Sequence, residues 1–251
     1  MGREALESSS AVLQTAADHA AHGARSVLAS LSHVNLAGIY GVEEQDGARY
    51  LVLEYVEGET LADRLDRGAL PVDEALELAV QIAAGVEAAH DAGIVHRDLK
   101  PDNIFLCRSG GGDAPPTVKL LDFGAARVVD PASPEDRLTK SGMVLGTPFY
   151  MSPEQWQAEP ASEASDVWAL GVILYEMLAG DPPHTGSTVQ AVIAKVVTDR
   201  PRPIGELRDT VPPHVAGVLH KALAKLPADR FAGASLFAAA LSEPGGTLDA
   251  Y

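Results

Sequence analysis

The sequence predicts an α+β chain in which a small β-containing N-terminal part precedes a larger, mainly helical part. Two short β-rich runs, residues 37–43 and 48–55, lie on either side of an Asp-Gly pair that is typical of a hairpin turn. A long amphipathic pattern over residues 72–92 predicts a helix. Proline residues then separate several further helical patterns in the last third of the chain.

The elements before residue 93 follow in order. The first 35 residues are rich in alanine and serine, and Val27, Leu28 and Leu31 recur at helical spacing, so one helix is expected before the hairpin. Residues 60–66 are expected to be helical as well. Gly93 is the expected stop of the long helix. One face of that helix carries apolar residues at helical spacing: Ala75, Ala79, Ile82, Val86 and Ala89.

The middle of the chain is less regular. Two apolar runs, residues 104–107 and 118–121, are expected to form short strands around the polar segment 108–116, which is rich in glycine and proline. Residues 130–148 are expected to form a second loop, long enough to be functional. Four helices are expected after it, at about 166–179, 187–198, 212–225 and 233–242.

Composition and charge restrict the class of protein. The chain has 251 residues, of which 46% are hydrophobic, and this is typical of a globular protein with a substantial core. Its 19 basic and 35 acidic side chains give a net charge of −16, which argues against binding to nucleic acid or to an anionic lipid surface. The single cysteine, Cys107, excludes an internal disulfide framework and fits a reducing compartment.

No secretory signal pattern or membrane span is expected. The longest apolar run, Val167 to Tyr175, has nine residues, whereas a helix that crosses a bilayer needs about 20. The N-terminal region lacks the basic start and apolar core of a signal peptide. The sequence therefore predicts a cytoplasmic chain.

The residues with the clearest chemistry form the stretch HRDLKPDN, from His96 to Asn103, and an Asp-Phe-Gly motif at Asp122, nineteen residues after Asn103. Transfer of a γ-phosphoryl group needs a carboxylate near the incoming hydroxyl, a cation near the phosphate and oxygen ligands for Mg²⁺. Asp98 would accept the proton of the hydroxyl, and Lys100 would balance the phosphate charge. The Asn103 amide and the Asp122 carboxylate would hold Mg²⁺ against the nucleotide.

Together these motifs resemble the catalytic core of a eukaryotic-type (Hanks-type) protein kinase, over roughly Val27 to Leu241. Other segments match the family in order. Residues 51–56 resemble the hinge, 146–154 the end of the activation segment, and 166–171 the central buried helix. The resemblance implies a protein-kinase-like α+β fold, with a mainly helical C-lobe and a truncated N-lobe of one helix plus a β-hairpin.

The resemblance also implies a division of the chain. Residues 1–26 would be a divergent N-terminal segment and residues 243–251 a tail. The partial kinase domain between them, 27–242, would consist of a residual N-lobe over 27–57 and a C-lobe over 58–242.

Several details resemble the bacterial, serine/threonine-specific branch of the family. Lys100 lies two residues after Asp98, and Thr147 stands in a Gly-Thr-Pro sequence. The phrase from Tyr150 to Gln155, YMSPEQ, looks most like the bacterial members. The implied cofactors are ATP and Mg²⁺, and the implied partners are proteins with serine or threonine acceptors.

Further site residues follow from the resemblance alone. The nucleotide would contact the hinge and an apolar floor: Leu53, Glu54, Val56 and Phe105, with Asp122 beside them. In the activation segment, Thr139 and Ser141 would be autophosphorylation sites or simply solvated loop hydroxyls, and Thr147 would contact the substrate and Asp98.

The remaining family positions are expected to be structural. Arg97 would receive a phosphorylated activation loop. Asp166 and the Glu154–Arg230 pair would be buried scaffold charges. His96 is expected to be a packed, hydrogen-bonded core residue.

The N-terminal part departs from the family pattern. No Gly-x-Gly-x-x-Gly loop precedes the hairpin, and no lysine precedes Lys100, so the family's phosphate lid and phosphate-gripping strand lysine are both missing. Weak Mg-ATP binding and much reduced phosphoryl transfer are therefore expected. Two alternatives stay open: a non-catalytic pseudokinase or scaffold module, and a truncated or frameshifted gene product.

Overall fold

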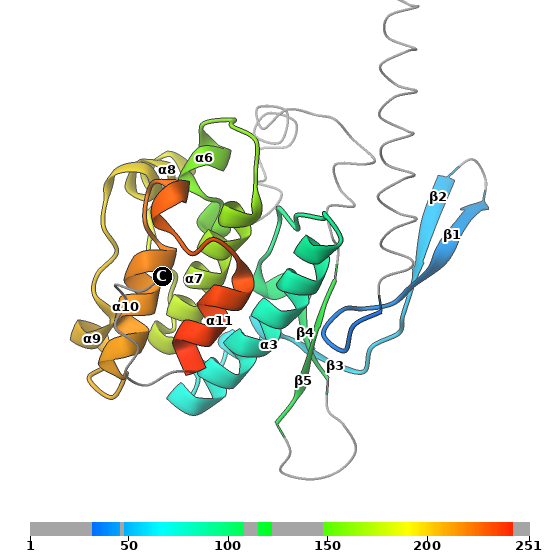
Figure 1. Ribbon diagram of the computed structural model, residues 1–251, viewed down its shortest axis with the longest axis horizontal. Coiled ribbons are helices and arrows are strands. Elements are labelled where there is room, and N and C mark those ends of the chain that lie inside the picture. Colours follow the sequence, from blue (N-terminus) through cyan, green and yellow to red (C-terminus); the bar gives the residue numbers. More distant parts are fainter. Residues whose placement is uncertain (1–31, 46–47, 108–114, 122–147, 243–251) are drawn as a thin grey trace, which may run out of the picture.

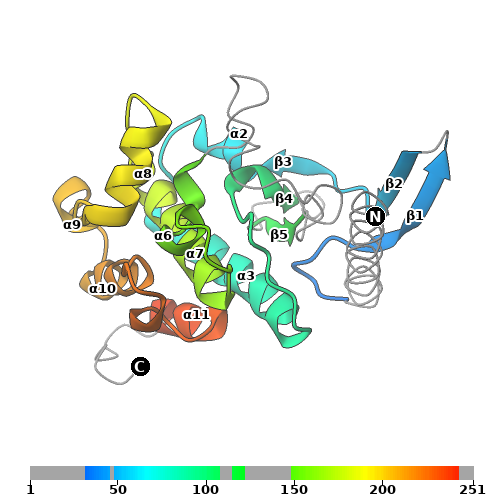
Figure 2. The same ribbon diagram turned by 90° about the horizontal axis from the view of Figure 1, so that it is seen from above.

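The structure is a computed structural model that describes residues 32–45, 48–107, 115–121 and 148–242. Its helices gather at one end, and a β-hairpin projects from the other (Figures 1 and 2). A three-stranded sheet lies between them. The helix predicted before the hairpin and the loop predicted after residue 130 lie outside the described residues, except for the last residue of that loop.

The hairpin consists of β1 (Ile39–Gln45) and β2 (Ala48–Leu53). The two strands are antiparallel, and their register runs from Ile39 opposite Leu53 to Gln45 opposite Ala48, with one irregularity between Ile39 and Gly41. The predicted hairpin is therefore confirmed, with strand ends within two residues of the expected ones.

The second sheet contains β3 (Gly58–Thr60), β4 (Ile104–Cys107) and β5 (Thr117–Leu120), in the order β3-β4-β5. Strands β4 and β5 were expected, whereas β3 is too short to show a period. Gly58 is suited to this strand because a Cβ atom there would collide with the carbonyl oxygen of Leu106. One face of the sheet contributes buried residues to the core: Ile104, Leu106, Val118 and Leu120.

Two helices lie between the strands in sequence. The short α2 (Leu61–Leu65) begins at Thr60, whose hydroxyl accepts a 3.0 Å hydrogen bond from the Asp63 N–H group. The long α3 (Val72–Asp91) confirms the predicted amphipathic helix, with its alanine, isoleucine and valine stripe buried.

The central helix is α7 (Glu163–Ala179), which is buried on nearly all sides because apolar residues occupy its whole circumference. Gly171 permits close helix packing, since a Cβ atom there would lie 2.9 Å from the Cβ of Ala222. Gly180 ends the helix with a φ of 88°, a conformation that glycine adopts without strain.

The other helices complete the layer around α7. Three of them match predicted helices: α8 (Val189–Thr198), α10 (Pro213–Ala222) and α11 (Ala234–Ser242). The helices α6 (Pro153–Trp156) and α9 (Ile204–Leu207) were not predicted, because four residues are too few to show a helical period. The described part of the chain also contains three short 3₁₀ turns: η1 (Pro101–Asn103), η2 (Pro148–Tyr150) and η3 (Pro227–Asp229).

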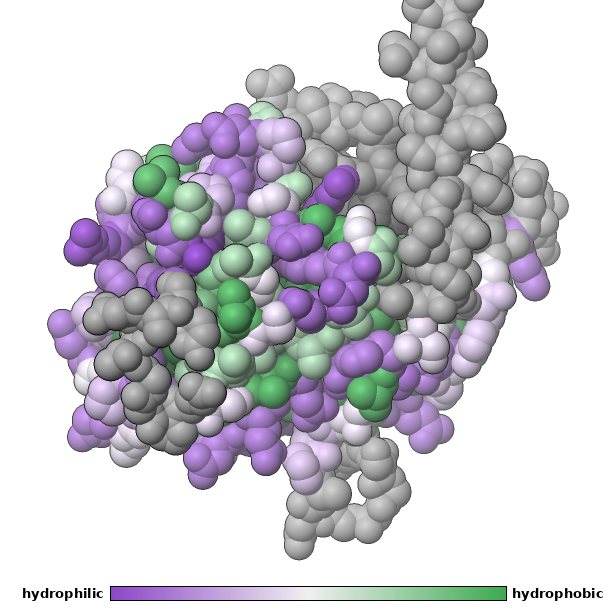
Figure 3. All heavy atoms as spheres, in the orientation of Figure 1, coloured by the Kyte–Doolittle hydropathy of each residue, from purple (hydrophilic) through white to green (hydrophobic). Residues whose placement is uncertain are grey.

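On the face drawn in Figure 3, hydrophilic and hydrophobic residues are interspersed over the coloured part of the surface. Among the described helices, none has the length and apolar character needed to cross a membrane.

The segment before the hairpin is attached to the C-terminal part. Asn35 is 5% exposed, and its carbonyl oxygen accepts a 2.9 Å hydrogen bond from the Leu120 N–H group. The Asn35 amide donates to the carbonyl oxygen of Val118 at 3.0 Å, and Leu36 forms a parallel bridge with Leu120. Gly85 of α3 permits this approach, since a Cβ atom there would lie 2.9 Å from the Asn35 carbonyl oxygen.

Candidate active site

Asp166, on the first turn of α7, fixes the loop that contains the HRD sequence. Its carboxylate is 1% exposed and accepts three hydrogen bonds. The His96 and Arg97 backbone N–H groups donate at 2.8 and 2.9 Å, and His90 Nε2, at the end of α3, donates at 2.8 Å. The loop is therefore held between two helices, with every donor directed at one buried carboxylate.

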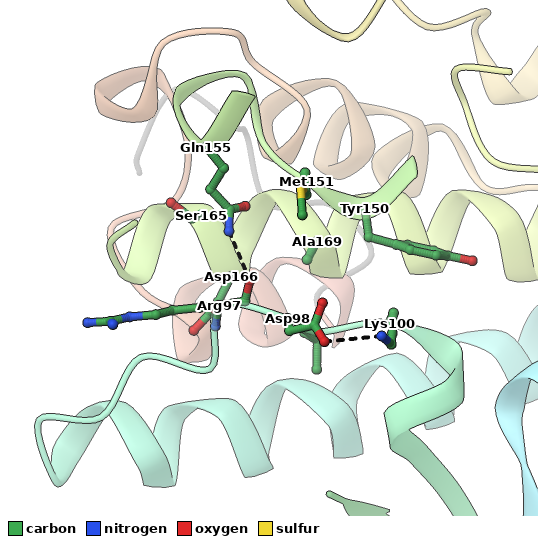
Figure 4. Close-up of a pocket in the computed structure, with 10 residues that line it drawn as sticks. Arg97, Asp98, Lys100, Tyr150, Met151, Gln155, Ser165, Asp166 and Ala169 are labelled. Atoms are coloured by element: carbon green, nitrogen blue, oxygen red, sulfur yellow. Dashed lines mark hydrogen bonds and ion pairs between the residues drawn. The ribbon is translucent and has the colours of Figure 1, made fainter. Parts of the chain in front are cut away.

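Arg97 has a left-handed backbone with a φ of 69°, which is uncommon for a residue with a side chain. Such a conformation costs about 1–3 kcal/mol and persists where neighbouring contacts hold it. Here the Arg97 N–H group donates to Asp166, and its carbonyl oxygen accepts a 2.9 Å hydrogen bond from Gln155 Nε2. The exposed guanidinium points away from Asp98 (Figure 4) and forms no hydrogen bond with the described residues.

The three predicted catalytic residues lie together immediately after Arg97. Lys100 Nζ lies 3.1 Å from Asp98 Oδ2, and these side chains are 18% and 41% exposed. Asn103 is 7% exposed, and its Nδ2 donates to the Asp98 carbonyl oxygen at 2.9 Å. The Asp98 side chain is thus partly exposed, while its backbone carbonyl group is held by the Asn103 amide.

A pocket opens over this group, between the loop that contains the HRD sequence and the segment that includes Tyr150 and Met151 (Figure 4). Gln155 and Ala169 close it from above in this view. The lining residues are Arg97, Asp98, Leu99, Lys100, Tyr150, Met151, Gln155, Ser165, Asp166 and Ala169.

His96 connects the loop that contains the HRD sequence to the residue before the Asp-Phe-Gly motif. It is fully buried, and its Nε2 donates a 3.1 Å hydrogen bond to the Leu121 carbonyl oxygen. Burial lowers the pKa of His96, which favours the neutral ring. The Leu121 N–H group donates to the Asn103 carbonyl oxygen at 2.9 Å, so the backbone before Asp122 is fixed beside Asn103. Asp122 itself lies outside the described residues.

Glu54, which was expected to lie in the hinge, forms a polar cluster with Gly38 and Lys119. Its Oε2 accepts from Lys119 Nζ at 2.8 Å and from the Gly38 N–H group at 2.9 Å. These two hydrogen bonds, from Lys119 first, lower the pKa of Glu54. Lys119 pairs across the sheet with Phe105, and paired residues point to the same face. Phe105 therefore lies on the face of the sheet that Lys119 shares with the hinge.

The Glu154–Arg230 pair joins α6 to the segment after η3. Two parallel hydrogen bonds of 2.8 Å connect the two groups, and Arg230 also donates to the carbonyl oxygens of Ala164, Ala224 and Lys225. Burial alone would raise the pKa of Glu154, but hydrogen bonds, above all from Arg230, lower it to about 2. Every N–H group of the guanidinium thus has an acceptor, as a buried charge requires.

Among the described residues, four contacts near the site were not predicted: the Glu54–Lys119 pair, the Tyr150–Glu176 pair, and the bonds of His90 to Asp166 and of Gln155 to Arg97. His90 had a signal, since it lies four residues after Val86 on the buried stripe of α3. Three predicted activation-segment residues lie outside the described residues: Thr139, Ser141 and Thr147.

Comparison with known proteins gives a consistent result. The family model described as the protein kinase domain matches residues 10–241. The probable serine/threonine-protein kinase PknB of Corynebacterium glutamicum is 37% identical over 220 residues, which cover 84% of this chain and 33% of that protein. The serine/threonine-protein kinase PknA of Mycobacterium tuberculosis is 38% identical over 220 residues, which cover 85% of this chain and 48% of that protein. The chain thus spans less than half the length of these relatives.

Solved structures agree with the sequence matches. The crystal structure of the Mycobacterium tuberculosis PknI kinase domain superposes with a TM-score of 0.66 at 28% identity, covering 88% of this chain and 76% of the other. The helical C-lobe and the small number of strands among the described residues agree with this similarity. The chain therefore belongs to the protein kinase domain family, and the relatives it resembles are bacterial serine/threonine-protein kinases.

Proposed function

We propose that this chain is a serine/threonine protein kinase domain that transfers the γ-phosphate of ATP to hydroxyl groups of proteins. The observation that carries the proposal is the Asp98–Lys100 pair, 3.1 Å apart, on a loop that Asp166 and Gln155 fix on both sides of Arg97. Phosphoryl transfer depends on positioning and charge, so a rigid loop with a half-exposed carboxylate suits this reaction.

Each site residue has a role in the proposed reaction. Asp98 orients the substrate hydroxyl and accepts its proton as the new oxygen–phosphorus bond forms and the bond to the ADP oxygen breaks. Lys100 offsets negative charge on the transferring group. Thr147 would contact the substrate, Arg97 would bind a phosphorylated activation loop, and the candidate phosphorylation sites are Thr139 and Ser141.

The described residues fit a magnesium nucleotide in part. The Asn103 amide donates through Nδ2 to Asp98, which leaves its Oδ1 without a hydrogen bond among the described residues. An amide oxygen and a carboxylate, which Asn103 and Asp122 would supply, are ligands that Mg²⁺ prefers. When bound, the metal ion would neutralise charge on the phosphates. Leu53, Glu54 and Val56 would line the adenine edge, with Phe105 beneath it.

We also propose that turnover by the 251-residue chain is low. No lysine precedes Lys100 in the sequence, and Lys119, which lies beside the expected hinge, is paired with Glu54. A missing preorganised donor costs about 10²–10³ in rate. The same observation favours the second candidate, a non-catalytic scaffold module. The single cysteine supports a reducing, cytoplasmic setting for either function.

A phosphorylation assay with γ-labelled ATP and Mg²⁺ tests the proposal. The full chain is incubated with a protein mixture, and the labelled amino acids are identified. Label on serine or threonine is expected, and it should disappear in Asp98→Asn but persist in Asp91→Asn, a matched change at an exposed aspartate. Label that survives Asp98→Asn, or none above background in any variant, contradicts the proposed activity. Nucleotide-dependent thermal stabilisation without label would instead support the scaffold module.

A further inference from the structure

We propose that Gln155 is a positioning residue that connects the beginning of α6 to the catalytic loop. The proposal rests on the proposed function, because its effect on rate is exerted through Asp98. Gln155 is the N3 residue of α6, and its amide bridges two backbone segments that lie 55 residues apart in sequence, at Arg97 and Ser152.

The partners of the amide determine its orientation. Gln155 Oε1 accepts from the Ser152 backbone N–H group at 3.0 Å and from its hydroxyl at 3.1 Å. Gln155 Nε2 donates to the Arg97 carbonyl oxygen at 2.9 Å. A backbone N–H group needs an oxygen opposite it, and a carbonyl needs a donor. Both ends of the amide therefore have a partner: its oxygen serves Ser152, and its NH₂ group serves Arg97.

The platform that carries Gln155 is rigid. Ser152 is fully buried, and the neighbouring Glu154 is held by the two 2.8 Å hydrogen bonds from Arg230. Helix α6 therefore has little freedom to move relative to the helices around it, and a side chain projecting from it can hold a loop in place.

The loop that receives the bond needs to be held. Arg97 has a φ of 69°, and Asp166 accepts only its N–H group. Without a partner for its carbonyl oxygen, the Arg97–Asp98 peptide could rotate towards a more relaxed conformation and turn the Asp98 side chain with it. Gln155 acts from α6 and Asp166 from α7, so the peptide groups on both sides of Arg97 are fixed (Figure 4).

Three variants separate this role from simple helix capping. Gln155→Glu keeps an acceptor for Ser152 but places an oxygen against the Arg97 carbonyl. Gln155→Lys keeps a donor for Arg97 and loses the acceptor. Ser152→Ala removes the hydroxyl contact and leaves the amide bridge to Arg97 intact, so it is the matched control.

Two measurements are made on the full chain. Hydrogen exchange of the peptide covering residues 94–100 should be faster in Gln155→Glu by about tenfold, and near wild type in Gln155→Lys and Ser152→Ala. In the γ-labelled ATP assay, kcat should fall by at least about tenfold in Gln155→Glu while KM for ATP changes little, because the group being displaced is Asp98 and not the nucleotide site.

The two measurements distinguish a failure of this inference from a failure of the proposed function. If the wild-type chain transfers no phosphate, the proposed function fails, but the exchange measurement still decides whether Gln155 holds the loop. Unchanged exchange in Gln155→Glu overturns the inference. Equal losses in Gln155→Glu and Ser152→Ala also overturn it, because they would assign the effect to the folding of α6.

Discussion

The Tyr150 hydroxyl donates a 2.7 Å hydrogen bond to Glu176 Oε2, near the end of α7. Tyr150 is 8% exposed, and Glu176 is half-buried. Burial raises the pKa of Glu176 from 4.5 to about 7, and the charges of Asp181 and Asp102 act in the same direction, against the hydrogen bond from Tyr150. Glu176 therefore changes charge near neutral pH, directly beside the segment that lines the pocket.

The first prediction concerns the pH dependence of stability. The folded chain holds a proton on Glu176 more tightly than the unfolded chain, so the contribution of this group falls as pH rises from about 4.5 to about 7. Glu176→Gln keeps an acceptor for Tyr150 and removes the titration. Relative to wild type, the free energy of unfolding of the variant should rise by about 1–3 kcal/mol across this pH range.

Urea unfolding of both chains between pH 4.5 and 8 measures this difference. The variant must be compared with wild type at each pH, because His184 also makes stability depend on pH. Burial first, and then the charge of Lys225, lower the pKa of His184 to about 4. The folded chain binds a proton at His184 less tightly than the unfolded chain. The stability that comes from the neutral ring is therefore complete above pH 6.5, the ordinary pKa of histidine, and is lost as pH falls towards 4. A variant-minus-wild-type difference that stays constant with pH would contradict the assignment to Glu176.

The second prediction concerns Asp166. In Asp166→Asn one carboxylate oxygen becomes an NH₂ group that faces N–H donors, so at least one of the three hydrogen bonds is replaced by a repulsive contact. A loss of about 2–4 kcal/mol in the free energy of unfolding is expected, because hydrogen bonds to charged groups contribute the most. Urea unfolding measures it, and Asp209→Asn, at an exposed aspartate, should change stability little. Equal effects of the two substitutions would disprove the scaffold role.

The third prediction concerns acid stability and the Glu154–Arg230 pair. The pKa of Glu154 is lowered to about 2, so its contribution is present above its ordinary value of 4.5 and is lost as pH falls through about 2. Glu154→Gln leaves the Arg230 charge buried without a counter-ion, which should cost about 3–5 kcal/mol at pH 7. The cost should shrink as pH falls below 4.5.

Circular dichroism during urea titrations at several pH values gives these differences. Glu163→Gln, an exposed change on the first turn of α7, is the control and should have a small effect at every pH. If Glu154→Gln lowers the free energy of unfolding by the same amount at every pH, the contact with Arg230 does not lower the pKa of Glu154.

The fourth prediction uses two helical glycines. In Gly85→Ala the new Cβ would lie 2.9 Å from the Asn35 carbonyl oxygen, so the segment before the hairpin must move, at a cost of about 1–3 kcal/mol. In Gly205→Ala no atom lies within 4 Å of the new Cβ, and the higher helix propensity of alanine should stabilise the chain by up to about 1 kcal/mol. Thermal unfolding of both variants tests the opposite signs. The same sign for both would refute the close-approach role of Gly85.

The sequence predicted the elements whose patterns are long or flanked by clear turn residues, such as the hairpin and α3. It did not predict β3, α6 or α9, because three or four residues show no period and are held in place by tertiary contacts. Sequence motifs indicated the candidate catalytic residues by type and spacing, and the structure places Asp98, Lys100 and Asn103 together.

Residues that act through long-range contacts were harder to predict. Lys119 and Glu54 lie 65 residues apart, and Gln155 and Arg97 lie 58 apart, so neither pair leaves a local pattern. Their chemistry is ordinary for surface residues, and only the fold brings the partners within hydrogen-bonding distance. Asp166 and Arg230 were expected to be buried because the family resemblance gave them a place in the fold.

The attachment of residues 35–37 to Leu120 covers the outer edge of strand β5. The Leu120 N–H group donates to Asn35 and its carbonyl accepts from Ala37, so two backbone groups of the outermost strand are satisfied within the chain. An uncovered strand edge is a template on which another chain can add a strand. A fragment that began after residue 37 would leave this edge uncovered and is expected to self-associate. The short stretch ahead of the hairpin therefore protects the chain against aggregation.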